Sequence, residues 1–346
     1  MDSSVAAAIL KEQGYEVVGL FMRNWREEEG GACTAEEDYA DVRRVCNTLD
    51  IPYYSIDFSK EYYERVFKFF VEEYKQGRTP NPDVLCNREI KFGPFKDFAE
   101  KLGADIVATG HYCGILDRDG KTYLKRAKDD NKDQTYFLSA VSEKQLKNVV
   151  FPLENLEKTE VRRIAEKYNL ATQAKKDSTG VCFIGERDFR KFLKEYIPMK
   201  RGDILDMSGN KVGEHDGVFY YTIGQRKGFG IGGGGNGEPW YIIKRDVKNN
   251  ILYVNQGECE ELFSETLIAE NFNFITDKVK DGGRYMARIR HRQPLQPCTV
   301  RYIDDTTLEV IFDTKQRAVA PGQYCVLYDD SRISDDGICY GGGIIK

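Results

Sequence analysis

Two segments of the chain place a single cysteine among residues that could activate it. In the stretch 79–92, Cys86 follows Asp83 by three positions, and the cations Arg88 and Lys91 come shortly afterwards. Nearby cations lower the pKa of a thiol, so such a cysteine could act as a nucleophilic thiolate. A lone cysteine is more often buried and inert, so this segment alone favours a structural interpretation.

The second segment, 177–187, shifts the interpretation toward chemistry. It has the same design, with small and turn-forming residues, one cysteine (Cys182) and then a charged pair. A second cysteine segment of the same design favours a chemical role over a structural one. A hydrolase built on Cys86 and His111 is disfavoured, because no third residue supplies the orienting partner.

The composition describes a folded protein with more than one domain. The chain has 346 residues, of which 41% are hydrophobic and 12% aromatic, enough for a large core and two or three domains. No apolar run approaches membrane-spanning length and no signal peptide is recognised, so we expect a cytoplasmic protein without membrane association. The net charge of −5 argues against indiscriminate nucleic-acid binding but allows a local basic face.

Cysteine and histidine usage argues against a structural metal site. Nine cysteines are scattered without any C-x-x-C pair, and the chain has three histidines. The odd cysteine number and the wide spacing fit a reducing compartment better than a disulfide framework. We therefore expect no metal held by the protein itself.

The order of elements predicts an α/β fold with a parallel sheet at the start of the chain. Helical patterns alternate with strand patterns at 15–22, 51–58 and 105–111. This alternation implies right-handed βαβ units, in which ligands bind at the carboxyl ends of the strands. Met22 and Gly110 fall at such ends.

The character of the sequence changes after about residue 187. Short β-type runs separated by Gly, Asn and Asp follow, which predicts a catalytic domain over 1–187, a small mixed domain over 188–260 and a β-barrel over 261–346. Within the first domain, Pro80 and Pro82 disfavour helix before them and predict a rigid, extended loop carrying the first cysteine segment.

Longer motifs carry a resemblance to a known family. They are FMRNW (21–25), TPNPD (79–83), CNREIKF (86–92), ATGHY (108–112), NKDQ (131–134), DSTGVCFIGER (177–187), YTIGQRKG (221–228) and QRAVAPGQ (316–323). On these motifs the whole chain resembles the tRNA-specific 2-thiouridylases, MnmA in bacteria and TrmU in mitochondria, which are N-type ATP pyrophosphatases.

The N-terminus departs from the family pattern. Asp2-Ser3-Ser4 resembles the end of the Ser-Gly-Gly-x-Asp-Ser loop, whose backbone N–H groups hold ATP phosphates, but the first strand and the Ser-Gly-Gly half do not precede it. We expect a truncation or a misplaced start codon to explain this, in preference to a loss of ATP chemistry.

The resemblance implies a reaction that uses both cysteines. ATP would adenylate the C2 oxygen of a wobble uridine in tRNA, and sulfur would replace AMP to give 2-thiouridine, with pyrophosphate as the other product. By the same resemblance, Cys182 carries the sulfur as a persulfide and Cys86 is the nucleophile that attacks it, with a transient disulfide between them. Asp83 would be the general acid or base.

The resemblance also assigns binding residues and partners. ATP, with Mg²⁺ accompanying it, is assigned to Asp2, Ser3, Met22 and Gly110. The target base is assigned to Asn81, Pro82 and Asp83, and the tRNA to His111, Lys132, Asp133, Gln134, Arg290, His291 and Gln323. A cysteine desulfurase or a sulfur-relay protein would donate the persulfide.

The spacing of arginines in the stretch 288–292 predicts RNA binding independently of the resemblance. Its arginines recur at a period of two, so they share one face of a strand and could bind phosphates. His291 stands where the family's pattern has Tyr, which keeps a planar ring.

Two alternatives stay open: a non-catalytic tRNA-binding protein, and a different adenylating ligase on the same fold, which would not need paired cysteines.

Overall fold

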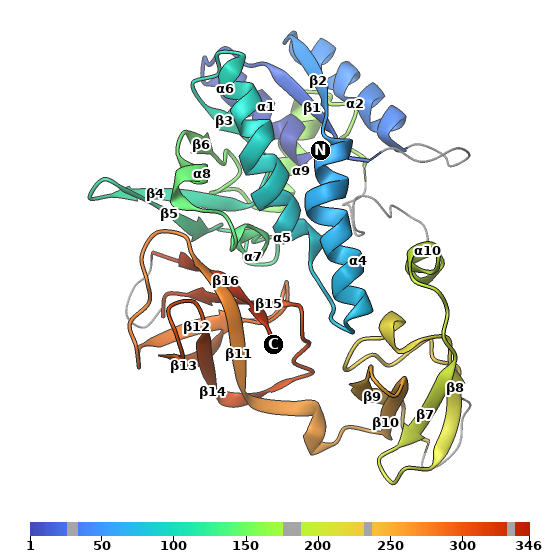
Figure 1. Ribbon diagram of the computed structural model, residues 1–346. Coiled ribbons are helices and arrows are strands. Elements are labelled where there is room, and N and C mark those ends of the chain that lie inside the picture. Colours follow the sequence, from blue (N-terminus) through green and yellow to red (C-terminus); the bar gives the residue numbers. More distant parts are fainter. Residues whose placement is uncertain (26–33, 176–187, 232–236, 331–335) are drawn as a thin grey trace.

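The computed structural model describes residues 1–25, 34–175, 188–231, 237–330 and 336–346. Three units follow one another: an α/β unit, a middle unit built on one sheet, and a C-terminal barrel (Figure 1). The second cysteine segment, 177–187, with Cys182, lies outside the described residues. Among the described helices, none combines the length and apolarity that a bilayer crossing requires.

The first unit contains the expected parallel strand pairs. β1 (Gly19–Arg23) pairs in parallel with β2 (Tyr53–Asp57), and β3 (Val107–Ala108) pairs in parallel with β6 (Val149–Val150). The strands are shorter than the sequence predicts, and the two pairs form separate two-stranded sheets in the described part. Helices α1 (Asp2–Glu12), α2 (Thr34–Leu49) and α9 (Lys158–Lys167) belong to the same unit, and α1 lies against both α2 and α9.

Two long helical runs cross this unit. The first consists of α3 (Ser59–Tyr62), the π-helical η1 (Tyr63–Phe67) and α4 (Lys68–Lys75). The second consists of α5 (Pro82–Cys86), the π-helical η2 (Asn87–Phe95) and α6 (Lys96–Lys101), with a kink at Gly93. π-Helical turns are frequent at functional sites, and both runs pack into the core cluster that contains Cys86.

The prediction of an extended loop around Asp83 and Cys86 is wrong. Both residues lie on α5, which begins at Pro82 itself. Proline is well suited to the first helical position, because its fixed φ fits a helix and its missing N–H would have no partner there. Asn81, the N-cap, is extended, and its side-chain oxygen accepts hydrogen bonds from the first turn.

The middle unit consists of helix α10 (Phe189–Tyr196) and the four-stranded sheet that follows it in the chain. Its strand order is β8-β7-β10-β9, and β7 and β10 are parallel. The elements are β7 (Gly202–Asp206), β8 (Lys211–His215), η3 (Val218–Tyr220), β9 (Trp240–Asp246) and β10 (Ile251–Gln256). In Figure 1 this unit lies beside the lower end of α4.

The C-terminal unit is a closed barrel of six strands in the order β11-β14-β13-β12-β15-β16, with β16 pairing back to β11. Its elements are η4 (Glu260–Leu262), β11 (Phe263–Phe274), β12 (Arg284–Arg288), β13 (Gln296–Tyr302), β14 (Leu308–Arg317), β15 (Tyr324–Tyr328) and β16 (Ile338–Ile345). Alternate residues of β14 point inward to the apolar core, as the predicted barrel requires.

A hairpin from the first unit extends the barrel sheet. It consists of β4 (Cys113–Arg118) and β5 (Lys121–Arg126), and β5 pairs with β16. Short helices α7 (Thr135–Leu138) and α8 (Glu143–Leu146) follow it, and α7 contacts both β5 and β16. The first and third units therefore share a sheet and a core cluster.

Candidate active site and nucleic-acid interface

Asp83 and Cys86 lie on one face of α5, three residues apart. Asn81 holds the start of this helix, because its Oδ1 accepts hydrogen bonds from the backbone N–H groups of Asp83 (3.2 Å) and Val84 (3.4 Å). Burial raises the pKa of Asp83, and Lys91, two turns further along, opposes that rise. A carboxyl group with a raised pKa is suited to proton transfer near neutral pH.

Cys86 is buried among aromatic side chains. Its side chain packs in a core cluster that includes Tyr62 and Phe67, and it is 6% exposed. The side-chain amide of Asn24 donates to Cys86 Sγ at 3.8 Å, whereas Asn24 Oδ1 is buried without a hydrogen-bond partner among the described residues. The expected pairing with Cys182 falls outside the described part of the chain.

His111 is fixed by two polar neighbours beside the same helix. Lys91 Nζ lies 3.3 Å from His111 Nε2, and Thr109 Oγ1 lies 2.8 Å from His111 Nδ1. An ammonium group can only donate, so Nε2 is the acceptor and Nδ1 carries the proton of the neutral ring. Burial, and then Lys91, hold the pKa of His111 well below its usual value. The geometry therefore presents a neutral histidine next to a cation.

Three of the four residues expected to bind ATP come together. A Cβ on Gly110 would lie 2.4 Å from Ser3 N and 2.6 Å from Asp2 C, so glycine is required for this backbone contact with the start of α1. The fourth, Met22, lies on β1 and packs against the core cluster that contains Cys86.

Lys158, the first residue of α9, completes the corner formed by Asp2 and Gly110. Its Nζ donates to both carboxylate oxygens of Asp2 (2.8 and 3.0 Å), and Tyr112 OH donates to Asp2 Oδ1 at 3.3 Å. A lysine at this corner supplies the positive charge that a phosphate group would need. Among the described residues, no group of three or more His, Cys, Asp or Glu side chains is placed to hold a metal ion.

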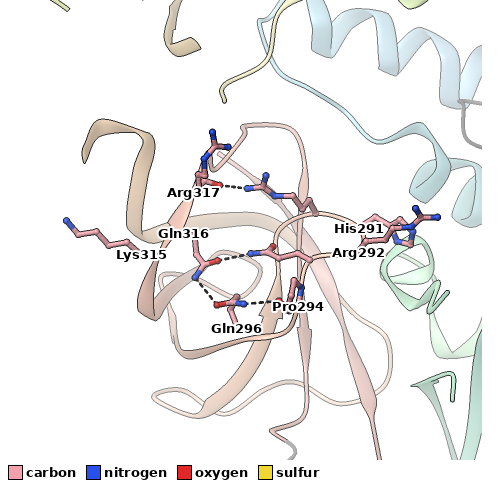
Figure 2. A pocket seen from close by; sticks show the side chains of 9 residues that line it. His291, Arg292, Pro294, Gln296, Lys315, Gln316 and Arg317 are labelled. Atoms are coloured by element: carbon pink, nitrogen blue, oxygen red, sulfur yellow. Dashed lines mark hydrogen bonds between the residues drawn. The ribbon is translucent and has the colours of Figure 1, made fainter. Parts of the chain in front are cut away.

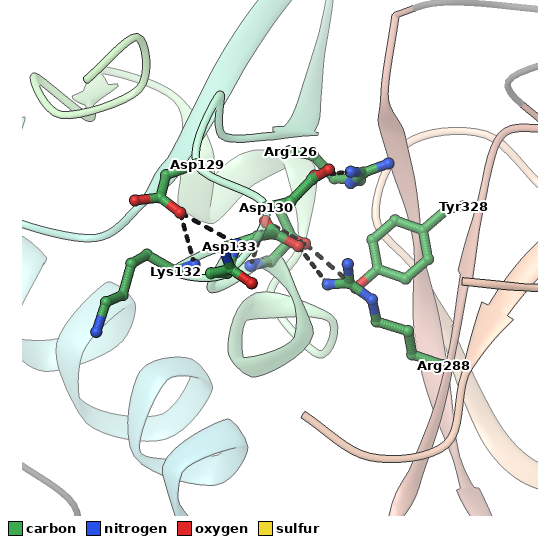
Figure 3. A network of polar contacts seen from close by, with 9 residues as sticks. Arg126, Asp129, Asp130, Lys132, Asp133, Arg288 and Tyr328 are labelled. Atoms are coloured by element: carbon green, nitrogen blue, oxygen red, sulfur yellow. Dashed lines mark hydrogen bonds and ion pairs between the residues drawn. The ribbon is translucent and has the colours of Figure 1, made fainter. Parts of the chain in front are cut away.

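Asp133 is placed differently from the contact with tRNA that the resemblance implies. Figure 3 shows its carboxylate facing Arg288 of the barrel, and Arg288 Nη1 donates to Asp133 Oδ2 at 2.6 Å. Thr135 Oγ1 donates to the same carboxylate, and both charged side chains are almost completely buried (0% and 5% exposed). This ion pair joins the first unit to the barrel.

The neighbours of Asp133 have separate contacts. Gln134 holds the backbone of Tyr112 from two sides: Tyr112 N donates to Gln134 Oε1 (3.0 Å), and Gln134 N donates to Tyr112 O (2.8 Å). The backbone N–H of Lys132 donates to Asp129, and its side chain extends away from the ion pair (Figure 3). Of the three residues assigned to tRNA here, Lys132 is the one whose side chain points away from the ion pair.

The barrel carries a pocket of about 420 Å³ lined by Arg290, His291, Arg292, Gln293, Pro294, Gln296, Lys315, Gln316 and Arg317 (Figure 2). Four of these nine residues are permanent cations. Arg290 Nη2 donates to the carbonyl oxygen of Arg317, while Arg317 and Lys315 also pair with Glu258 and Glu260. Burial and the neighbouring Arg317 lower the pKa of Arg290. A polar, cationic pocket of this kind fits phosphate groups.

His291 contributes an aromatic face rather than a charge. Its ring lies 4.4 Å from that of Phe137, tilted by 39°. Burial, and then the cations Arg292, Arg288 and Lys132, lower the pKa of His291 to about 4, so the ring is neutral at physiological pH. Its buried Nδ1 has no hydrogen-bond partner among the described residues.

Known proteins match the chain over its whole length. Family models described as tRNA methyl transferase HUP domain, tRNA methyl transferase PRC-barrel domain and aminomethyltransferase beta-barrel domain match residues 1–186, 190–256 and 264–345. The tRNA-specific 2-thiouridylase MnmA of Alkaliphilus oremlandii is 52% identical over 100% of this chain and 94% of its own length. That of Listeria innocua is 53% identical over 100% of this chain and 92% of its own.

The chain belongs to the tRNA-specific 2-thiouridylase family. The family models carry descriptions that speak of methyl transfer, whereas the full-length relatives are named as thiouridylases, and the full-length matches decide because they span all three units. A relative from Geobacillus kaustophilus, named tRNA-specific 2-thiouridylase MnmA 2, matches over the same extent at 52% identity.

Several residues of this thiouridylase site escape sequence reasoning. Asn24 lies within a motif that carries the resemblance, but nothing in its position indicates a contact with Cys86. The spacing predicts Lys91 as a cation near Cys86, whereas its side chain contacts His111. Lys158 lies outside those motifs, and its only local signal is its place at the start of a helix opened by a capping box at Glu157. Their contacts join segments far apart in the chain, which no local pattern encodes.

Proposed function

We propose that this protein catalyses the ATP-dependent 2-thiolation of the wobble uridine in tRNA, as a tRNA-uridine sulfurtransferase. The observation that carries the proposal is the match over the full chain, at 52–53% identity, to proteins named tRNA-specific 2-thiouridylase. The arrangement of the site is consistent with it: a cysteine and a carboxyl group share one helix face, Lys158 lies at the start of α1, and a cationic pocket lies on the barrel.

The target uracil is proposed to enter above α5. Asn81 and Pro82 would shape the entrance, and Asp83 would exchange a proton with the base. The raised pKa of Asp83 supports this role, because a raised pKa makes a carboxyl group a better proton acceptor and brings its proton exchange closer to neutral pH. A wobble base must leave the anticodon stack to reach such a site.

Sulfur transfer is proposed to use Cys86 and Cys182. The Cys86 thiolate would attack the inner sulfur of a Cys182 persulfide, forming a transient disulfide and releasing hydrosulfide, which replaces the activated C2 oxygen of uracil. An external thiol would then reduce the disulfide. Asn24 supports the role of Cys86, because an amide donor stabilises a thiolate.

ATP is proposed to bind at the corner formed by Asp2, Ser3 and Gly110, with Met22 toward the cysteine side. The close backbone approach at Gly110 and the ammonium group of Lys158 support a phosphate there. Bound ATP would supply the adenylyl group that turns the C2 oxygen into a leaving group. Mg²⁺ would arrive with the nucleotide, whose phosphates provide the oxygen ligands it prefers.

The tRNA is proposed to lie across the barrel and the first unit. Arg290 and His291 would contact it at the barrel pocket, and His111 and Lys132 would contact it near the base. Asp133 and Gln134 would act indirectly, since their side chains hold Arg288 and the backbone of Tyr112. The division into a catalytic domain (1–187), a small central domain (188–260) and a tRNA-binding barrel (261–346) is part of this proposal.

A direct test is to incubate the protein with tRNA, Mg-ATP and a persulfide donor such as a loaded cysteine desulfurase. Nucleoside mass spectrometry then measures 2-thiouridine. Formation of 2-thiouridine that requires ATP and both cysteines supports the proposal. Retention of tRNA without ATP consumption would support the non-catalytic alternative, and activity that survives replacement of both cysteines would support a different ligase. A cytoplasmic location, where tRNA and such donors occur, is proposed with it.

A further inference from the structure

Thr79, directly before the proposed base-binding residues, is the point where all three units meet. Its backbone N–H donates to Pro321 O of the barrel at 2.7 Å, and its backbone carbonyl oxygen accepts from Gln323 Nε2 at 2.7 Å. Its hydroxyl lies 3.2 Å from the hydroxyl of Thr222 in the middle unit. Every polar group of this one residue is thus engaged by a segment distant in sequence.

The barrel segment reaches Thr79 through a backbone contact that only glycine permits. A Cβ on Gly322 would lie 2.7 Å from Thr79 N and 2.9 Å from the Cβ of Arg78, and its φ is +93°. The buried Tyr136 lies behind Gln323: its OH is 3.5 Å from Gln323 Oε1 and donates to Tyr324 O at 3.0 Å. The orientation of the Gln323 amide is thus set by its donation to the Thr79 carbonyl.

The middle unit holds the other side of this junction. A Cβ on Gly77 would lie 2.2 Å from Val247 Cγ2, so the middle unit packs directly on the end of α4. The turn that carries Thr222 also touches the barrel, since a Cβ on Gly224 would lie 2.5 Å from Ala318 Cβ. The residues that follow Thr79 are Pro80 and then Asn81, the cap of α5.

We propose that Gln323 is a positioning residue that sets the start of α5 through Thr79, in addition to the tRNA contact that the resemblance implies for it. This inference rests on the proposed function and gives Gln323 a second role in it. With the carbonyl of Thr79 held by the barrel, Asn81 is placed to cap α5, and the cap fixes Asp83 and Cys86. Loss of the bond frees the start of the helix, and misplaced reacting groups lower the rate more than the affinity.

The decisive variant is Gln323→Glu, which keeps the shape but replaces the amide donor with a carboxylate facing the Thr79 carbonyl. We expect kcat for 2-thiouridine formation at saturating tRNA to fall about tenfold, a larger effect than any change in the Kd for tRNA. A matched control is Gln76→Glu, which adds the same charge at an exposed glutamine near the junction and should leave both values unchanged.

A second measurement reports on the helix without any activity. Amide hydrogen exchange at Asp83 and Val84 should quicken in Gln323→Glu and in Gly322→Ala, whose new Cβ would push the barrel segment from Thr79. If the unaltered protein makes no 2-thiouridine, the proposed function fails and exchange alone decides this inference. Unchanged exchange in both variants overturns it, as does a Kd for tRNA weakened about tenfold with kcat intact, which would leave Gln323 with the tRNA contact alone.

Discussion

The α5 site and the barrel pocket handle charge in opposite ways. Around α5, burial raises the pKa of Asp83 and lowers that of His111, so both groups are moved toward their neutral forms. The barrel pocket instead gathers permanent cations, and its one histidine is neutral. A site that exchanges protons needs groups with adjustable charge, whereas a surface that binds a polyanion needs charges that stay fixed. The two regions are thus suited to reaction and to binding respectively.

Replacing Cys86 with serine gives the sharpest break between reaction and binding. We expect the rate of 2-thiouridine formation to fall by about three orders of magnitude or more, because a hydroxyl cannot replace a thiolate in sulfur exchange. The Kd for tRNA should stay within about twofold, since Cys86 is buried and belongs to the α5 site. Single-turnover thiolation and filter binding measure the two effects; a parallel loss of tRNA binding would contradict the separation.

Breaking the buried ion pair between Asp133 and Arg288 should have the next largest effect, a loss of unfolding free energy. Asp133→Asn leaves Arg288 buried without its carboxylate, which typically costs about 3–5 kcal/mol of unfolding free energy. Asp313→Asn is the matched control. Asp313 forms a surface ion pair with Arg284, which lies on β12 like Arg288, and the substitution should cost about 1 kcal/mol or less of unfolding free energy. Urea denaturation compares them. Equal costs would show that burial does not govern the Asp133 pair.

How much the sequence predicts differs between the same two regions. The parallel strands and the barrel follow from local patterns, because alternation is a short-range signal. The prediction that the arginines of 288–292 share one strand face is wrong: β12 ends at Arg288, which is buried against Asp133, and Arg290 and Arg292 follow the strand, with Arg292 at a φ of +64°. The α5 site is predicted less well: helix begins at Pro82, where an extended loop was expected, since proline's effect depends on its place in the helix. The buried state of Asp133 depends on Arg288, 155 positions away, and no local pattern encodes that distance.

The contribution of the barrel pocket to tRNA binding should appear in the salt dependence of that binding. Arg290→Gln and Arg292→Gln should each weaken tRNA binding about tenfold at low salt and reduce the slope of log K against log salt by about 0.9 for each phosphate that the variant no longer neutralises. Arg301→Gln removes an exposed arginine from strand β13, outside the pocket, and serves as the control. Titrations at several salt concentrations measure both quantities. An unchanged slope in both pocket variants would remove the pocket from the tRNA interface.

The two histidines allow the smallest and most direct comparison of the regions. Lys91 lowers the pKa of both His111 and Asp83, so Lys91→Met should raise both values and leave that of His291 unchanged. Lys132→Met should instead raise the pKa of His291 slightly, because Lys132 is the weakest of its three cationic neighbours. NMR titration of the histidine rings measures the shifts.

The lowered pKa of His111 also predicts how the stability of the protein depends on pH. The folded pKa of His111 lies below the unfolded value of about 6.5, so the unfolded chain binds the proton first, and this residue lowers stability as pH falls below about 6.5. Lys91→Met, by raising the folded pKa, should lessen that loss, whereas Lys132→Met should leave the contribution of His111 unchanged. Denaturation between about pH 5 and 7 tests this. If Lys91→Met shifts neither the His111 titration nor the acid loss of stability, the ammonium does not tune the α5 site, and burial alone accounts for its neutral histidine.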